Sequence, residues 1–399
     1  MTLKDVLRKV ETGWSPVCDS ARPAVDEWGV LKLSAVTSGK FVASEAKRLP
    51  NEVLPRIAFE VQPGDVLMSR ANGVKALVGV ACTVNQVRPR LLLPDLVFRL
   101  VADPDLLDPG FLGIVLTSAA VRRQIEAAMR GTSGQYKVSQ ADVRALEIPR
   151  LPLSEQRDIV AAHEAFERRI GALERELDKL RTVEKAVVAG AMAECGGRVE
   201  LGRWLSSIEA GKSPMAEDTP AGDGEWGVLK VSAVQPGWFK AIENKVVREA
   251  EFINARYRVC AGDLLMTRAN TEELVGLACV VRERAERLML SDKTLRLVPD
   301  TGVAEAEFIE LALLSPSVRS QVRSRATGTS ASMKNIGQSA VRQLMVPDVP
   351  KDMQRKVVAA VSASRKRSQG VQQQIAKLRQ VQRGVMEDLL SGRSRVNRT

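Results

Sequence analysis

Residues 27–36 read EWGVLKLSAV, and residues 225–234 read EWGVLKVSAV. Nine of these ten positions are identical at an offset of 198 residues, which chance does not produce. The same offset relates residues 64–72 (GDVLMSRAN) to residues 262–270 (GDLLMTRAN). The chain therefore contains a tandem duplication, and its repeat length of 198 residues is far too long for a solenoid.

Further matches give the internal organisation of the repeat. The offset of 198 also relates Gly13, Ser15 and Pro16 to Gly211, Ser213 and Pro214, and Gly131-Thr132-Ser133 matches Gly328-Thr329-Ser330 after a slip of one residue. Each half is then a globular region followed by a charged helical tail. The predicted boundaries are a first globular domain at 1–150, a first helical spacer at 151–197, a second domain at 198–348 and a second spacer at 349–399.

Each globular region is predicted to be α+β. Short β-rich segments at 30–36, 77–84 and 96–101, bounded by Gly, Pro or Asp, predict strands. The stretch from Phe111 to Arg130 predicts a helix stopped by Gly131, and the stretch from Glu307 to Arg325 predicts its twin.

Both tails carry the seam of a coiled coil, with apolar residues at alternating spacings of four and three. A helix over 155–192 would be about 55 Å long, so it predicts a spacer rather than a core element. An antiparallel pairing of the two tails about their midpoints would place Phe166 near Gln382, and Glu184 near Ser364 and Ser368. The seam positions are Ile159, His163, Phe166, Ile170, Leu173, Leu177, Leu180, Glu184, Val187 and Ala191 in the first tail, and Val357, Val361, Ser364, Ser368, Val371, Ile375, Leu378, Gln382, Val385 and Leu389 in the second.

Composition indicates a globular protein with an anionic partner. The 399 residues are 45% hydrophobic and 27% charged, and the formal net charge is +11. Lys and Arg that contact phosphates release counterions, so this charge favours nucleic acid. Aromatic residues make up only 4%, which favours a duplex over single strands that stack on aromatic rings. The N-terminal segment lacks the apolar core of a secretory signal, and we expect a cytoplasmic protein.

The sequence offers no catalytic or metal-binding constellation. The five cysteines include no CxxC pair and there is one histidine, His163, so the spacing of metal ligands is absent. Gly211-Lys212-Ser213 lacks the earlier glycine of a Walker A loop, because position 206 is serine. Val361 occupies the position equivalent to His163, so the repeat argues against a catalytic histidine. We expect a non-catalytic protein with no cofactor of its own.

These motifs together resemble the specificity subunits of type I restriction-modification enzymes. The resemblance covers nearly the whole chain. It rests on residues 28–32, residues 64–72 and their copies, residues 131–134, LPLSEQR at 151–157 and MEDLLSG at 386–392. The chain departs from the pattern at Met353, which replaces the glutamate of the second Glu-Gln-Arg segment, and at Ser364 and Ser368, which weaken the second seam.

The resemblance implies a function and a set of partners. It implies two target-recognition domains, each reading one half of a bipartite double-stranded DNA sequence, and two helices that pair as an antiparallel coiled-coil spacer. It also implies two methyltransferase subunits, which would use S-adenosylmethionine to methylate adenine, and translocating restriction subunits. The alternative that the residues leave open is a stand-alone two-module protein that bridges DNA without enzyme partners.

Two polar loops in each half are the candidate DNA contacts, because their side chains suit base edges or phosphates. The alternatives are that Asn72 caps its loop, that Arg70 pairs with Asp65, and that the second loop only ends a helix. Glutamine and arginine at the start of each tail are candidates for partner docking or for packing of the helix on its domain: Gln156, Arg157, Gln354 and Arg355. The candidate DNA contacts are Arg70, Asn72, Thr132, Ser133, Gln135, Tyr136 and Lys137, and Arg268, Asn270, Thr329, Ser330, Lys334 and Asn335.

Residues that are identical in both halves cannot distinguish two different half-sites, so they are expected to contact phosphates, the scaffold or a partner. Base specificity is expected where the halves differ. The divergent stretches are 37–62 against 235–260, and 73–77 against 271–274.

Overall fold

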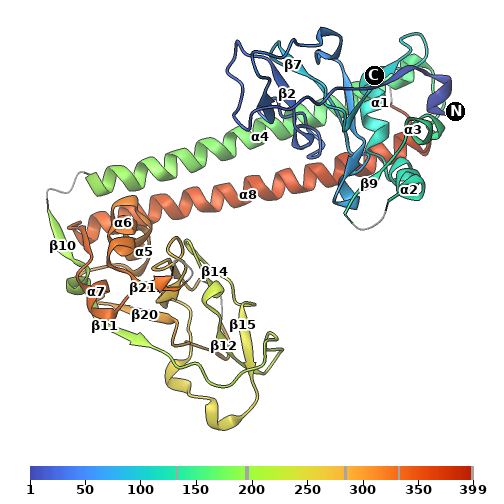
Figure 1. The fold of residues 1–399 in the computed structure, drawn as a ribbon. Helices are drawn as coiled ribbons and strands as arrows, with labels where there is room; N and C mark the ends of the chain where they lie inside the picture. Colours follow the sequence, from blue (N-terminus) through green and yellow to red (C-terminus); the bar gives the residue numbers. More distant parts are fainter. Residues whose placement is uncertain (132–133, 194–196, 283–284, 331–332, 397–399) are drawn as a thin grey trace. The chain divides into compact units, whose positions relative to one another are not determined.

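The computed structural model describes residues 1–131, 134–193, 197–282, 285–330 and 333–396. Its contacts divide the chain into two compact units (Figure 1). Unit 1 comprises Met1–Glu174 and Gln373–Thr399, and unit 2 comprises Arg175–Gln372. Each unit thus contains one globular domain, the beginning of the helix that follows it, and the end of the other long helix.

Domain 1 is built on a four-stranded antiparallel sheet with the order β1-β8-β4-β6. A second, three-stranded sheet has the order β3-β2-β7, and it shares a core with the first sheet, because Leu67, Cys82 and Val97 of the first sheet pack with Leu31 and Ala46 of the second. The strands are β1 (Leu7–Thr12), β2 (Gly29–Leu31), β3 (Ala46–Arg48), β4 (Val66–Ser69), β5 (Ala71–Asn72), β6 (Ala81–Thr83), β7 (Leu91–Leu92), β8 (Val97–Ala102) and β9 (Tyr136–Lys137). The helices are α1 (Pro109–Leu116), α2 (Ala119–Ala128) and α3 (Gln140–Ala145).

Domain 2 repeats this topology, with sheets in the orders β11-β20-β16-β18 and β15-β12-β19. Strand β11 has the same register irregularity as β1, between Leu205 and Ser207 instead of between Leu7 and Lys9. The strands are β10 (Arg198–Glu200), β11 (Leu205–Ala210), β12 (Trp226–Leu229), β13 (Val234–Gln235), β14 (Trp238–Phe239), β15 (Asn244–Val247), β16 (Leu264–Thr267), β17 (Ala269–Asn270), β18 (Ala278–Val280), β19 (Leu288–Met289), β20 (Thr294–Pro299), β21 (Thr327–Ser330), β22 (Met333–Asn335) and β23 (Met345–Pro347). The helices are α5 (Ala306–Leu314), α6 (Pro316–Arg325) and α7 (Gln338–Arg342).

The α+β prediction is confirmed, but two of its details are wrong. The single helix predicted from Phe111 to Arg130 is two helices, because Ser118 accepts a hydrogen bond from the Val121 N–H and caps α2. Its twin is likewise divided, with Pro316 at the first position of α6. The predicted strands are also too long. The strand predicted at 30–36 ends at Leu31 and continues as a short 3-10 turn, Leu33–Ala35. The strand predicted at 77–84 is limited to β6, Ala81–Thr83, because Leu77 ends a 3-10 turn that begins at Lys75.

The tails form the long helices α4 (Leu153–Ala193) and α8 (Lys351–Leu390). They pair antiparallel in both units. In unit 1, Gln382 donates a hydrogen bond to Glu167 over 2.9 Å. In unit 2, Arg365 donates to Glu184 over 3.0 Å and Ser364 donates to the Leu180 carbonyl over 3.4 Å. The coiled coil is therefore confirmed, and its register agrees with the predicted one to within about one helical turn.

The helix pair also carries the apolar surfaces on which the domains rest. In unit 1, Ile159 of α4 and Met386 and Leu389 of α8 belong to the core of domain 1. In unit 2, Val357 and Val361 of α8 belong to the core of domain 2, with Val187 of α4 packed against it. His163 lies half-buried on α4, and burial lowers its pKa. None of the helices in the described part of the chain could span a membrane.

Burial gives the cysteines different reactivities, which a thiol assay can test. Burial raises the pKa of both Cys82 and Cys279 to about 12, so both thiols stay protonated at pH 8, where the thiolate is the reactive form. We expect neither to react with a thiol reagent in the folded protein, whereas the exposed Cys260 reacts at once. Mass spectrometry of the labelled peptides checks this, with the unfolded protein as control; rapid labelling of Cys82 in the folded protein would contradict it.

Candidate nucleic-acid interface

In domain 1, the structure brings together two candidate loops that lie more than sixty residues apart in the sequence. Strand β5 pairs antiparallel with β9, so that Ala71 lies opposite Lys137 and Asn72 lies opposite Tyr136. The Val138 N–H donates to the Arg70 carbonyl over 3.0 Å and extends this pairing. We call β5 and β9 ribbon 1. Of the candidate residues in these strands, Lys137 is exposed, and Asn72 and Tyr136 are partly exposed. Gln135 and Arg70, which directly precede the strands, are exposed and partly exposed, respectively.

Domain 2 builds the same arrangement from its own two loops. Strand β22 pairs with both β17 and β21, and Asn270 lies opposite Lys334 while Ala269 lies opposite Asn335. The Ile336 N–H donates to the Arg268 carbonyl over 2.9 Å, as Val138 does in domain 1. We call β17, β21 and β22 ribbon 2. Of the other candidates, Thr132 and Ser133 lie outside the described residues, as do the side chains of Thr329 and Ser330.

Each ribbon depends on one glycine. Gly131 has φ +134° and Gly328 has φ +146°. A Cβ on Gly131 would lie under 3.0 Å from the Gln135 carbonyl oxygen, and a Cβ on Gly328 would meet the Met333 carbonyl oxygen as closely. Helix α2 already ends at Ala128. The glycine that the sequence assigned to a helix stop is therefore required by the hairpin that follows the helix.

The local contacts of Arg70 and Asn72 decide between the alternatives left by the sequence. Asn72 does cap its loop, because its side-chain oxygen accepts from the Val74 N–H over 2.9 Å. Asp65 is 3.2 Å from Arg99 and not paired with Arg70 in the described contacts. The Arg70 guanidinium instead lies over the Phe98 ring, 5.6 Å from its centroid. Among the described contacts, the Arg70 guanidinium makes no hydrogen bond, so its N–H groups can bind a ligand.

A further segment adjoins each ribbon, and the sequence reasoning did not assign it to the site. In domain 1, Ser15 donates to Asp95, and the next carbonyl, that of Leu96, accepts from the Arg70 N–H over 2.8 Å. In domain 2, Ser213 donates to Asp292 and the Lys293 carbonyl accepts from the Arg268 N–H over 2.8 Å. The identical Gly-x-Ser-Pro spacing in the two halves was the available signal.

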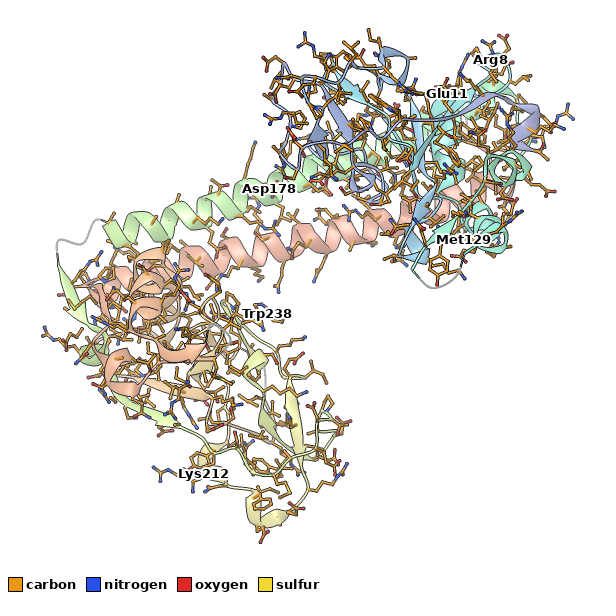
Figure 2. The ribbon with its side chains drawn as sticks, viewed as in Figure 1. Arg8, Glu11, Met129, Asp178, Lys212 and Trp238 are labelled. Atoms are coloured by element: carbon orange, nitrogen blue, oxygen red, sulfur yellow. The ribbon has the colours of Figure 1, made fainter. Side chains whose placement is uncertain are left out.

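This segment makes the two interfaces chemically different. Lys212 and Lys293 are exposed beside ribbon 2. Figure 2 shows the Lys212 side chain projecting outward from the backbone of domain 2. The equivalent positions in domain 1 hold Trp14 and Leu96. These two lysines therefore place positive charges beside ribbon 2 at positions that are uncharged in domain 1. Within the described part of the chain, no three His, Cys, Asp or Glu side chains are grouped as metal ligands would be.

The glutamines that begin the tails are buried. Gln156 accepts from the Asp108 N–H over 2.9 Å and donates to the carbonyls of Leu106 and Leu151. Gln354 makes the same three kinds of contact in domain 2. It accepts from the Glu305 N–H over 3.0 Å and donates to two carbonyls. These contacts pack each helix on its domain, which is the alternative that the sequence left beside partner docking.

Their arginine neighbours lie at the surface. Arg157 is exposed. Arg355 is also exposed, and it pairs with Glu305 over 2.8 Å. Partner docking therefore stays a prediction. The two exposed arginines could contact a partner, whereas the buried glutamines could not.

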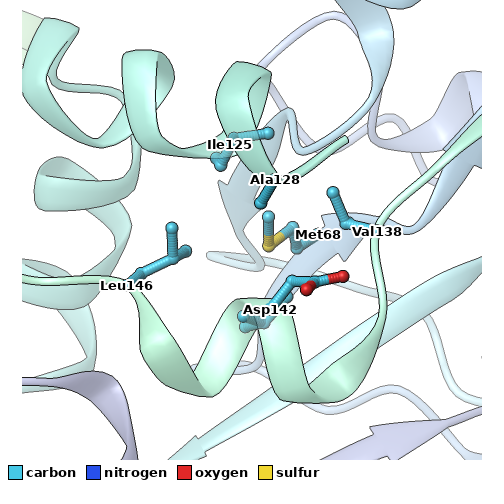
Figure 3. Close-up of a pocket in the computed structure, with 7 residues that line it drawn as sticks. Met68, Ile125, Ala128, Val138, Asp142 and Leu146 are labelled. Atoms are coloured by element: carbon cyan, nitrogen blue, oxygen red, sulfur yellow. The ribbon is translucent and has the colours of Figure 1, made fainter. Parts of the chain in front are cut away.

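A narrow hollow in domain 1 offers no room for a ligand. The hollow in Figure 3 lies between β4, α2 and α3, and it is too narrow to admit a ligand. Its lining is apolar apart from Asp142, whose carboxylate accepts from the Ser139 hydroxyl over 2.6 Å. The lining residues are Met68, Ile125, Ala128, Val138, Asp142, Val143 and Leu146.

Comparison with known proteins shows what the chain is similar to. No family model matches the chain. It is 34% identical to the specificity subunit of the type I restriction enzyme EcoEI from Escherichia coli over 164 residues, which are 41% of this chain and 27% of that protein. It is 28% identical to the EcoKI specificity subunit of Escherichia coli (strain K12) over 132 residues, which are 33% of this chain and 28% of that protein. The aligned region thus spans little more than a quarter of each relative.

The fold comparison extends over nearly the whole chain. The S subunit of a type I restriction-modification system from M. genitalium superposes with a TM-score of 0.58 and 13% identity, over 98% of this chain and 95% of that chain. A chain from a structure of complex assembly and conformational transition in a type I system gives a TM-score of 0.59 and 18% identity, over 98% and 96%. The resemblance found in the motifs is confirmed: the chain is similar to type I specificity subunits in sequence and has their fold.

Proposed function

We propose that this chain binds double-stranded DNA at a bipartite target and acts as the specificity subunit of a type I restriction-modification complex. One observation carries the proposal. Two equivalent domains each present an exposed ribbon that gathers Arg70 or Arg268 with the polar residues of a distant loop. A duplicated module suits a target read at two half-sites.

The chemistry of the ribbons supports phosphate contact by their shared residues. Arginine at the same position in both ribbons provides a permanent charge with several N–H donors, which suits phosphate oxygens. Base reading belongs to residues that differ between the domains. Residues 73–77 follow ribbon 1 directly and include Lys75, whereas the corresponding loop of domain 2 contains Glu273, which pairs with Arg323 over 3.1 Å.

The chain would contribute recognition and no catalysis. Under this proposal two methyltransferase subunits, carrying S-adenosylmethionine, dock on the repeated surfaces, and restriction subunits join them. The test is co-expression with a type I methyltransferase subunit encoded beside it, followed by native mass and methylome sequencing of the host DNA. Two partners per chain and adenine methylation at a bipartite motif are the expected result. A chain that stays alone and adds no methylation would favour the stand-alone bridging protein.

Replacing Arg70 or Arg268 with alanine is expected to weaken binding to every duplex by a similar factor. The slope of log affinity against log salt should fall by about 0.9 for each phosphate contact that is lost. Binding to several duplex sequences, measured over a range of salt, gives both quantities. Arg8→Ala is the control, because Arg8 pairs with Asp103 over 3.1 Å, away from the ribbons. A change in sequence preference with an unchanged slope would show that Arg70 reads bases instead.

A further inference from the structure

Glu310 is a fully buried carboxylate on α5 of domain 2. One of its oxygens accepts from the Val280 N–H over 2.6 Å and from Arg282 over 3.0 Å. The other oxygen accepts from Arg282 over 2.7 Å and from Arg365 of α8 over 3.2 Å. Buried carboxylates are costly unless they are paired and hydrogen-bonded, and this one is both.

The network continues from the domain into the helix pair. Arg365 also donates through Nε to Glu184 of α4 over 3.0 Å. Two carboxylates and two guanidiniums therefore alternate in one neutral chain that joins α5, α8 and α4 within unit 2. Arg282 additionally donates to the Gly237 carbonyl over 3.1 Å, which ties the turn between β13 and β14 to the same network.

Domain 1 has the same backbone at this place but different chemistry. Gly113 occupies the position of Glu310, two residues after a buried phenylalanine in each domain. A Cβ on Gly113 would lie under 3.0 Å from the Thr83 hydroxyl, so a side chain at this position would require Thr83 to move. Glu167 occupies the position of Arg365, and its partner in the domain is the exposed Lys40 at 3.8 Å.

The contacts that join each domain to the long helices should therefore differ in rigidity between domain 1 and domain 2. The exposed pair of Lys40 and Glu167 is screened by water and contributes little. The Glu310 carboxylate is fully buried, although the Arg365 side chain is 33% exposed. Moving domain 2 on the helices would separate Glu310 from Arg365 and leave Arg282 as its remaining partner, and removing a partner from a buried carboxylate is unfavourable.

We propose that Glu310 and Arg365 are positioning residues, whose ion-pair network around one buried carboxylate fixes domain 2 on the α4–α8 pair and so selects the length of the spacer between the two half-sites. This inference rests on the proposed function. Neither residue is placed to touch DNA; both act through the orientation of the domain that carries ribbon 2.

The experiment selects DNA from a random duplex library with the full-length protein and sequences the bound molecules. Wild type is expected to return two half-sites at one spacer length. With Glu310→Gln, the same half-sites should return, but neighbouring spacer lengths should be recovered about tenfold more often than with wild type. Lys40→Ala is the matched control from domain 1, and it should keep the wild-type spacer.

Glu310→Gln leaves two partly exposed guanidiniums without the carboxylate that they share, so its folding must be checked by a cooperative thermal transition. A second variant, Glu184→Gln with Arg365→Gln, keeps the pair of Glu310 and Arg282 inside domain 2 and removes only the link to the helices. It should broaden the spacer in the same way, and it decides the question if Glu310→Gln does not fold. Folded variants that keep a single spacer length would overturn the inference. A wild-type protein that selects no bipartite sequence would instead overturn the proposed function.

Discussion

Replacing Gly131 with alanine is expected to lower the affinity for target DNA at least tenfold while the domain stays folded. A Cβ at this position would lie under 3.0 Å from the Gln135 carbonyl oxygen, and φ is +134°. Strain of this kind costs about 1–3 kcal/mol, and backbone atoms cannot rotate away as a side chain can. The hairpin must open, and ribbon 1 then loses the pairing that holds Tyr136 and Lys137 beside Asn72. Gly328→Ala should affect ribbon 2 in the same way.

The measurement is duplex binding in parallel with thermal unfolding. Gly39→Ala is the matched control, because Gly39 also has a positive φ, +76°, yet a Cβ there has no neighbour within 4 Å. It separates the conformational cost of alanine from the clash in the ribbon. Wild-type affinity in Gly131→Ala would mean that the ribbon does not contact DNA, and equal loss in both variants would point to general destabilisation.

The features that could be predicted from the sequence are those that repeat or have a short period. The offset of 198 residues was visible in EWGVLKLSAV and its copy, and it gave two like domains. The seam of the tails gave both long helices and a register that the contact of Gln382 with Glu167 supports. The apolar periodicity did not predict the break between α1 and α2. The apolar residues on both sides of Ser118 fit a single helix, yet Ser118 caps a new one.

The candidate site was predictable in its parts and not in its assembly. The loops that contain Arg70 and Tyr136 were predicted separately as DNA contacts. They are close together because β5 pairs with β9, and this pairing depends on tertiary contacts. The neighbouring Ser15 was recognised only as a repeated residue. Glu310 gave no signal at all, because a glutamate on a predicted helix is ordinarily solvated, and its burial depends on Arg365, which lies 55 residues further along the chain.

Gln354→Leu is expected to lower the free energy of unfolding by about 3 kcal/mol. The fully buried amide satisfies the Glu305 N–H and the carbonyls of Val303 and Val349. Leucine has a similar volume but no hydrogen-bonding group, so these backbone groups would stay buried and unpaired, at about 1–3 kcal/mol each before relaxation. Gln156→Leu should have a comparable effect in domain 1, where the Asp108 N–H and the Leu106 and Leu151 carbonyls lose their partner.

Denaturant unfolding measures the effect, with Gln373→Leu as the control. Gln373 is an exposed glutamine on the same helix, so its replacement should change stability by less than about 0.5 kcal/mol. The comparison also decides between the two roles that the sequence allowed for Gln354. If the glutamine joins helix to domain, stability falls whether or not a methyltransferase is present. If it instead docked a partner, stability would stay within the range of the control and co-purification of the methyltransferase would fall.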